Sequence, residues 1–321
     1  RTSTRSPSHR YSRDGGRNWS DPEQMSYHPH GRHIKNPRAC PKLWKTENGK
    51  YLFWFHNHSS KSYRGRNPAW IAGGVEHDGH IHWSQPEILL YSPDANMRMS
   101  YPDLIEQDGR YWVTETQKTT ARVHEVDPSL LKDLWSQRRV SRMAKRGLIL
   151  RLSGTDQCRG EAPLPEPLRL DRPEGLSLDF WIRLDDLSPD QIVLDTRDSS
   201  GRGLAVTTTE NETLRLALSD GEHSASWEAD ARGFQAGRWH HVAVMVDPDP
   251  RIIMFVVDGE FCDGGSERTY GWGRYEKTLG EVTGGGRLRL GPTLKGQLDR
   301  VHVYARCLRV SEAVAHWRAE V

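Results

Sequence analysis

The sequence lacks the features that mark membrane proteins and polyanion-binding proteins. No run approaches the roughly 18 consecutive apolar residues that a membrane-spanning helix needs, and 35% of the residues are hydrophobic. Charge of one sign is not in excess, because 45 Lys and Arg face 43 Asp and Glu, a formal net charge of +2. So balanced a surface does not favour nucleic acid or an anionic membrane as a partner. We expect neither nucleic-acid binding nor membrane insertion.

Cysteine is also scarce. The four cysteines, Cys40, Cys158, Cys262 and Cys307, lie far apart without a C-x-x-C pair, so we expect no zinc site. Cys262 and Cys307 share one half of the chain and could form a disulfide, but four cysteines allow three pairings and the sequence does not choose among them. The chain begins at Arg1 without Met or a secretion signal, so we expect it to be the C-terminal part of a longer protein.

Tryptophan and glycine, in contrast, are abundant. The chain has 12 Trp and 29 Gly in 321 residues, a combination common in all-β carbohydrate-active proteins. Its length is sufficient for two domains, each with a full core. The first half repeats itself: residues 12–22 read SRDGGRNWSDP and residues 76–86 read EHDGHIHWSQP. Both place an Asp-Gly turn five residues before a Trp, followed by Ser, one variable residue and Pro.

A second pair of segments repeats at a similar spacing of roughly 60 residues. Residues 40–55 (CPKLWKTENGKYLFWF) and residues 101–116 (YPDLIEQDGRYWVTET) each contain an Asn-Gly or Asp-Gly turn between strand-like flanks. Such turns favour two-residue hairpins. About four strands in roughly 60 residues indicate a β-propeller blade. We expect the Asp of each Trp-containing segment to accept hydrogen bonds from its own backbone, and the Trp to fold back over the hairpin.

The stretch Ser12-Arg13-Asp14-Gly15-Gly16-Arg17-Asn18-Trp19 resembles the Asp-box of bacterial sialidases, which are six-bladed propellers. The resemblance covers roughly residues 1–135 and implies that they are the last blades of a partial propeller. Two blades cannot close a ring, since propellers need about 4–8. We therefore expect further blades to precede Arg1, and the chain alone to be inactive.

Residues 99–115 (MSYPDLIEQDGRYWVTE) resemble the sialidase segment that presents the catalytic tyrosine, and this resemblance gives that role to Tyr101. The chemistry is suitable because the anomeric carbon of a sialoside sits beside a carboxylate, which would repel an anionic nucleophile but not a neutral phenol. The phenol needs a nearby base. In the family that base is a Glu, which would lie upstream of Arg1, as would the acid/base Asp.

Sialidases grip the carboxylate of the sugar with three arginines, whose planar forks each make two charge-assisted bonds to a carboxylate. Residues 62–79 resemble a strand that carries one of them, and Arg66 is our first choice with Arg64 as runner-up. Residues 1–16 resemble the equivalent strand of the preceding blade, where Arg1 matches best and Arg5 is an alternative. The third arginine would lie in the preceding blades.

The sequence gives weaker evidence that other polar residues of the first half belong to the site. Glu106 abuts the Asp-Gly turn and is expected to be exposed, whereas Glu115 could approach the site. The histidines of residues 28–33 and 56–58 are spaced for polar loops or sugar contacts rather than for a metal. We expect no metal and no cofactor in this half.

The second half is predicted to be a separate β-sandwich. Residues 136–146 form a basic linker, and from residue 147 to 321 alternating strands return between Gly, Asp and Asn turns. Residues 237–247, 253–260 and 295–313 resemble the concanavalin A-like, laminin G-like jelly roll. The resemblance implies structural roles for Trp239 and His240, and leaves open whether the loops bind glycan or calcium. The aromatic loop at residues 266–277 could stack on a sugar.

Taken together, the sequence predicts an all-β chain with propeller blades at 1–135 and a jelly roll at 147–321. The resemblance implies a secreted or periplasmic glycoside hydrolase of the exo-α-sialidase type, acting on sialylated or other acidic glycans. Tyr101 would be the nucleophile, and Arg66, Arg64 and Arg1 the candidates that hold the sugar. The alternative is a catalytically silent, lectin-like protein on the same scaffolds.

Overall fold

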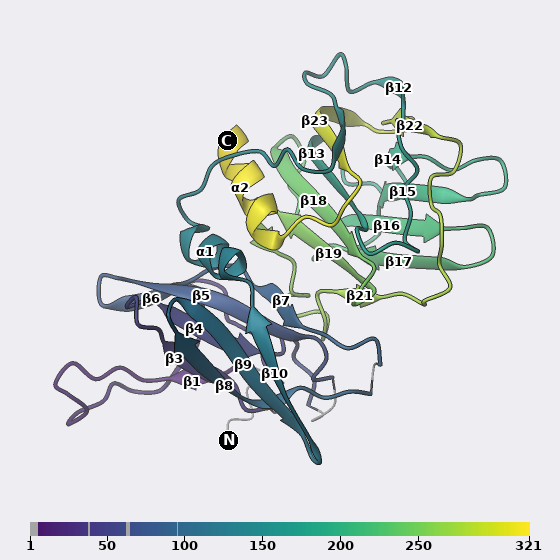
Figure 1. The fold of residues 1–321 in the computed structure, drawn as a ribbon. Coiled ribbons are helices and arrows are strands. Elements are labelled where there is room, and N and C mark those ends of the chain that lie inside the picture. Colours follow the sequence, from purple (N-terminus) through teal and green to yellow (C-terminus); the bar gives the residue numbers. More distant parts are fainter. Residues whose placement is uncertain (1–5, 38, 62–64, 95) are drawn as a thin grey trace. The chain divides into compact units, whose positions relative to one another are not determined.

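The computed structural model describes residues 6–37, 39–61, 65–94 and 96–321 (Figure 1). The chain divides into two compact units, Arg1–Val140 and Ser141–Val321. The boundary lies inside the basic stretch 136–146. Strands dominate both units and pair in antiparallel fashion, so the prediction of an all-β chain is confirmed. No helix among the described residues is long and apolar enough to cross a membrane.

The first unit contains antiparallel sheets whose strands follow one another in sequence, as the strands of propeller blades do. One sheet has the order β3-β4-β5-β6, with β7 also pairing β5, and another has the order β10-β9-β8. A short ribbon pairs β1 with β2. The elements are β1 (Ser8–His9), β2 (Glu23–Gln24), β3 (Lys42–Lys45), β4 (Tyr51–Phe55), β5 (Ala69–His77), β6 (His80–Trp83), β7 (Glu87–Leu90), β8 (Ser100–Gln107), β9 (Arg110–Gln117), β10 (Thr120–Val126) and α1 (Pro128–Ser136).

Three of the predicted Asn-Gly and Asp-Gly hairpins are confirmed, whereas Asp14-Gly15 lies in the long loop between β1 and β2. Asp78 and Gly79 join β5 to β6 with φ of 50° and 72°, and Asp108 and Gly109 join β8 to β9 with φ of 53° and 72°. Two consecutive left-handed residues match the right-handed twist of the flanking strands, which is why Asp-Gly is favoured here. At the β3–β4 turn only Gly49 is left-handed, with φ of 80°.

The two Trp-containing segments differ in structure. Asp14 holds an exposed loop, because its Oδ1 accepts the backbone N–H of Arg17 at 3.1 Å and of Asn18 at 2.9 Å. These bonds lower the pKa of Asp14 to about 2. Trp19 donates to Gly16 O at 3.0 Å but is 58% exposed, so the expectation that it covers a hairpin was wrong. Trp83 is 3% exposed and meets that expectation.

Helix α1 covers the sheet that contains β5. Asp127 caps the helix by accepting from Ser129 N at 2.8 Å, and the apolar stripe of the helix is buried. Gly73 allows the close approach, since a Cβ there would lie 2.8 Å from Leu134 Cβ. Trp135 Nε1 donates to Tyr51 O at 2.9 Å. The helix therefore belongs to the core of the first unit and is not a loose linker.

The second unit is a sandwich of two antiparallel sheets. One has the order β11-β23-β13-β18-β19-β20, with β21 on β19, and the other has the order β12-β22-β14-β15-β16-β17. Apolar side chains of both sheets fill the space between them. The elements are β11 (Leu148–Arg151), β12 (Gly160–Pro163), β13 (Leu176–Leu184), β14 (Ile192–Asp195), β15 (Gly203–Thr208), β16 (Leu214–Ser219), β17 (Ser224–Glu228), β18 (Trp239–Asp247), β19 (Ile252–Val257), β20 (Glu260–Phe261), β21 (Gly273–Arg274), β22 (Arg287–Leu290), β23 (Gly296–Tyr304) and α2 (Val310–Glu320).

A buried carboxylate fastens α2 to the sandwich. Asp179 on β13 is completely buried and accepts from His241 of β18, His302 of β23 and His316 of α2 at 3.0, 3.2 and 2.9 Å. His316 Nε2 accepts from Ala144 N, so its Nδ1 carries the proton that it donates. Burial alone would raise the pKa of Asp179, but the histidines, His241 foremost, hold it well below its usual value.

The open question of the cysteines is answered for all four. Cys158 and Cys262 are buried, Cys40 is exposed, and no disulfide joins any two of the four. The disulfide that Cys262 and Cys307 could have formed is therefore absent. The sandwich is therefore held by its apolar core and its hydrogen bonds.

Candidate functional site

Tyr101 occupies a β-bulge at the start of β8. Ser100 pairs with Thr116 and Asp103 pairs with Thr114, so Tyr101 and Pro102 both lie opposite Glu115. Tyr101 has φ of 52° and is 64% exposed. A left-handed aromatic residue is uncommon, and such strain clusters at functional sites. Bulges redirect a side chain away from the regular alternation of the strand, and here the redirected side chain is a phenol that reaches solvent.

Arg66 lies beside the residue that precedes this tyrosine. Its Nη1 donates to Ser100 Oγ at 2.8 Å, and its carbonyl oxygen accepts from Met99 N at 3.1 Å. The structure thus brings Arg66 and the segment carrying Tyr101 together, although they are far apart in sequence. Arg64 and Arg1, and the alternative Arg5, lie outside the described residues.

Glu115 stands behind the bulge as a completely buried carboxylate. Its Oε1 accepts a short hydrogen bond from Arg122 Nε, and His124 Nε2 lies 3.4 Å from the same oxygen. The bond raises the pKa of Arg122, so its guanidinium stays charged. Its Oε2 has no hydrogen-bond partner among the residues that the structure describes. A buried oxygen without a partner costs free energy, and this one lies directly behind the bulge.

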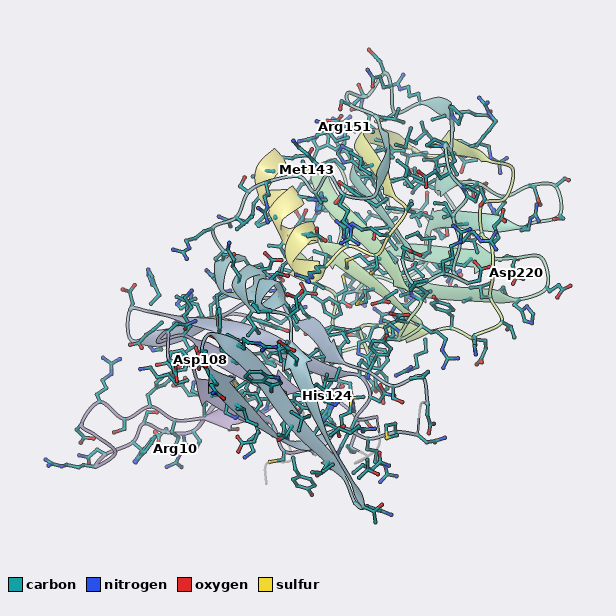
Figure 2. All side chains as sticks on the ribbon, in the orientation of Figure 1. Arg10, Asp108, His124, Met143, Arg151 and Asp220 are labelled. Atoms are coloured by element: carbon teal, nitrogen blue, oxygen red, sulfur yellow. The ribbon has the colours of Figure 1, made fainter. Side chains whose placement is uncertain are left out.

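The loop that leads into the bulge is fastened to the same strands. Arg122 Nη1 lies 3.5 Å from Met97 Sδ, and Arg98 N donates to Gln117 Oε1 at 2.6 Å. Figure 2 labels His124, which lies on β10, one of these strands. The position of Tyr101 is therefore set by β9 and β10 as well as by its own strand.

The other predicted polar residues of the first unit are structural. Glu106 Oε2 accepts the backbone N–H of Glu47 at 2.9 Å and so joins β8 to the β3–β4 turn. His56 and His58 are buried, not sugar-contacting, and burial lowers their pKa values to about 3 and about 4. Both are therefore neutral at neutral pH. Within the described ranges no group of three His, Cys, Asp or Glu side chains could hold a metal ion.

The aromatic loop of the second unit is part of its packing. Trp272 and Tyr275 are 5% and 6% exposed, and Gly273 lies so close under Trp227 that a Cβ would meet that ring at 2.4 Å. Trp227 Nε1 donates to Gly271 O at 3.1 Å. The loop is consequently no exposed stacking platform, contrary to the hypothesis from the sequence.

Sequence reasoning proposed Tyr101 as a site residue but did not predict the bulge at this position. The signal was present, because Pro102 cannot donate to a strand ladder and Pro inside a strand pattern marks an edge or a bulge. The contact between Arg66 and Ser100 left no such signal. It depends on two segments that only the fold brings together.

Comparison with known proteins identifies the second unit. A family model described as the concanavalin A-like lectin/glucanases superfamily matches residues 156–313. This part of the chain is a concanavalin A-like domain, which confirms the prediction from residues 237–247, 253–260 and 295–313. No curated protein matches the chain.

Among solved structures, the chain is similar to the botulinum neurotoxin serotype D binding domain (12% identity, TM-score 0.39, 57% of this chain and 46% of that one). It is also similar to Trypanosoma rangeli sialidase (13% identity, TM-score 0.37, 98% of this chain and 58% of that one). A third similar structure is the CBM40 of Ruminococcus gnavus IT-sialidase bound to α2,3 sialyllactose (13% identity, TM-score 0.38, 53% of this chain and 98% of that one). The chain spans about half the length of the first two. Likeness of this degree carries no argument about activity.

Proposed function

We propose that the first unit contributes the nucleophile and one carboxylate-binding arginine to a glycoside hydrolase of the exo-α-sialidase type. The observation that carries the proposal is the bulge at Tyr101, which strains an aromatic residue into a left-handed conformation and exposes its hydroxyl. Folding does not benefit from this arrangement, since burial of the ring would be more favourable. A hydroxyl that has to contact a ligand would explain why the ring is exposed and its backbone strained.

The residues around Tyr101 suit an acidic sugar. Arg66 is held beside Ser100, next to the bulge, and a sugar carboxylate bound by its guanidinium would lie near the tyrosine. The phenol would pass its proton to a general base and form the bond to the anomeric carbon, while the leaving group departs with a proton from a general acid. Water would later cleave the glycosyl–tyrosine bond, and the phenol would regain its proton. Glu115, behind the bulge, keeps Arg122 in place and so supports the backbone that presents Tyr101.

One observation favours the alternative, a binding protein without catalysis. Arg66 already donates to Ser100, so part of its hydrogen-bonding capacity belongs to the fold. On this alternative the exposed Tyr101 ring would stack on a sugar rather than react with it. The two functions make different predictions for removal of the hydroxyl alone.

The test is release of a fluorescent leaving group from an α-sialoside by the full-length protein, comparing wild type with Tyr101→Phe. Loss of the nucleophile should reduce turnover by roughly a thousand-fold or more. Tyr91→Phe, which removes another exposed tyrosine hydroxyl of the same unit, should leave turnover unchanged.

Turnover that survives Tyr101→Phe would remove this residue from the site. Absence of turnover by the folded wild type, together with binding of a free acidic sugar that Tyr101→Ala weakens and Tyr101→Phe does not, would establish the binding alternative.

A further inference from the structure

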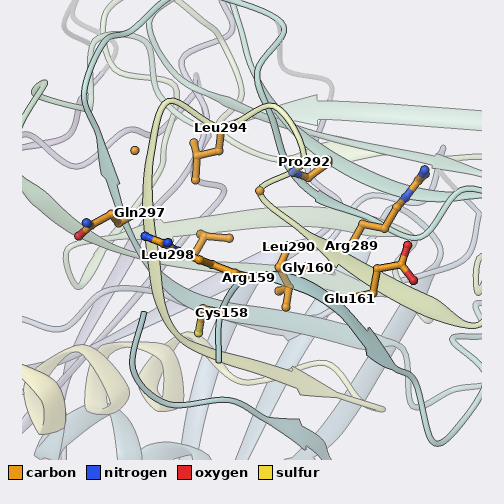
Figure 3. A pocket seen from close by; sticks show the side chains of 12 residues that line it. Cys158, Arg159, Gly160, Glu161, Arg289, Leu290, Pro292, Leu294, Gln297 and Leu298 are labelled. Carbon is orange, nitrogen blue, oxygen red and sulfur yellow. The ribbon is translucent and has the colours of Figure 1, made fainter. Parts of the chain in front are cut away.

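The second unit has a pocket of about 470 Å³ at the edge of the sandwich, where strands of the two sheets separate. β12 and β22 of one sheet form one wall, and the start of β23 of the other sheet forms the opposite wall. The loop from Gly291 to Leu294 closes one edge. Figure 3 shows Gln297 on one side of the pocket and Glu161 with Arg289 on the other.

The floor of this pocket is apolar. Leu290 and Leu298 are nearly buried and lie next to Cys158, and Leu294 lines the edge above them. The thiol of Cys158 adds no charge to the floor, because burial raises its pKa. A buried free cysteine behaves as a small hydrophobic group. The floor therefore suits the C–H face of a ring.

The rim of the pocket carries one positive charge that forms no ion pair with the described part of the chain, that of Arg159. Glu161 is paired with Arg287 at 2.7 Å, and Arg289 donates to Asp195 at 2.8 Å. Arg159 makes no hydrogen bond or ion pair within the described ranges, and neither does the side-chain amide of Gln297. An unpaired guanidinium matches a carboxylate in a bidentate manner, and an amide can both donate to and accept from hydroxyl groups.

We propose that this pocket binds a single carboxylate-bearing sugar residue. Arg159 would hold the carboxylate, Gln297 the hydroxyl groups, and Leu290 with Leu294 the C–H face of the ring. The volume lies within the range typical of small-molecule sites. The proposal goes beyond the hydrolysis proposed above, because the pocket belongs to the other unit and its binding would hold whether or not Tyr101 is catalytic.

A glycine supplies a way to fill the pocket without disturbing its walls. Gly160 lines the pocket with φ of 75°, and a Cβ there would meet no atom within 4 Å. Asn tolerates the left-handed region better than most residues, so Gly160→Asn should place an amide in the pocket. Gly201 is the matched control, since it has φ of 81°, equal space and no part in the pocket.

The experiment is a ligand-observed NMR titration of the full chain with D-glucuronate, D-glucose and acetate. Glucose has the ring without the carboxylate, and acetate the carboxylate without the ring. We expect glucuronate to bind most tightly, and Arg159→Gln to weaken it about ten-fold or more through loss of a charge-assisted bond. Gly160→Asn should also weaken it, whereas Gly201→Asn and Arg172→Gln, which removes an exposed charge elsewhere, should not.

Three results would overturn the proposal. Equal affinity for glucose would show that the carboxylate is not recognised. Equal affinity for acetate would show an anion site without a sugar subsite. Binding of glucuronate that is unchanged in both Arg159→Gln and Gly160→Asn would place it outside this pocket. None of these results involves turnover, so failure here is distinct from failure of the hydrolase proposal.

Discussion

Glu115 in the first unit and Asp179 in the second are both carboxylates without exposed surface, each on a central strand and each surrounded by basic side chains. They differ in how their oxygens are used. Both oxygens of Asp179 accept hydrogen bonds from histidines. Glu115 receives Arg122 and His124 on one oxygen, and its other oxygen has no partner in the described part of the chain.

The difference distinguishes a carboxylate that fastens the fold from a carboxylate next to the candidate site. A buried carboxylate with every oxygen satisfied stabilises the fold around it and can be explained by the fold alone. A buried oxygen without a partner costs free energy that folding does not recover. In this chain it lies opposite the strained bulge at Tyr101. The next four predictions test this contrast, beginning with the largest effect.

Asp179→Asn should lower the free energy of unfolding of the second unit by about 3–5 kcal/mol, because an amide group replaces an oxygen that the histidine N–H groups need. Urea unfolding, with hydrogen exchange of the backbone amides of β13 and α2 as the readout, measures this change in the free energy of unfolding. Asp171→Asn, in an exposed pair with Arg169, should cost only about 0–1 kcal/mol. Equal costs for the two variants would contradict a fastening role for Asp179.

Glu115→Gln should cost less, about 1–2 kcal/mol, because the amide oxygen can still accept from Arg122 and the other oxygen has no partner to lose. On the proposed function, turnover of the α-sialoside should fall by a larger factor than the loss of folded protein accounts for. The measurements are urea unfolding of the first unit and kcat against KM. A stability loss as large as that of Asp179→Asn would remove the contrast between the two carboxylates.

Asp247 extends the comparison to a half-buried carboxylate without a basic partner among the described residues. Burial raises its pKa to about 6, so the native state binds the proton more tightly than the unfolded chain. The stabilisation is therefore present below about pH 4 and is lost as the pH rises through 6. Asp247→Asn should be more stable than wild type by roughly 2 kcal/mol at pH 8 and equal to it at pH 4. An equal effect at both pH values in urea unfolding would contradict this.

Asp14 provides the smallest effect, since its carboxylate is exposed and fastens only its own loop. Asp14→Ala should leave the unfolding midpoint unchanged and accelerate hydrogen exchange at the backbone amides of Arg17 and Asn18, which donate to it. The exchange of β5 and β6 should not change. Protection of the two amides that persists in the variant would show that the carboxylate does not hold the loop.

Local features of the fold were predictable because they depend on neighbours in sequence. Asp78-Gly79 and Asp108-Gly109 each supply the two left-handed residues that a two-residue hairpin requires, and both hairpins were predicted from the sequence. Alternation and turn spacing predicted β18, β19 and β23 within a few residues. The start of α2 at Val310 follows from the Ser-Glu pair near its first turn.

The candidate site was only partly predictable. A resemblance pointed to Tyr101 and Arg66, but the bulge, the bond from Arg66 to Ser100 and the burial of Glu115 depend on the pairing of β8, β9 and β10. The histidines at 56–58 were misjudged for the same reason, since a polar sequence gave no sign that the segment is buried. The pocket around Arg159 combines strands of two sheets and had no signal in the sequence.

The two Trp-containing segments mark the division most clearly. The sequence by itself determined that each contains an Asp-Gly turn, because backbone preferences are local. Only the tertiary structure decided that Trp83 is buried against Phe53 and Gly74 while Trp19 remains in solvent. The physical reason is that burial requires a second surface. For Trp83 that surface comes from β4, distant in sequence, and from the part of β5 that precedes the segment, and no pattern within the segment itself specifies it.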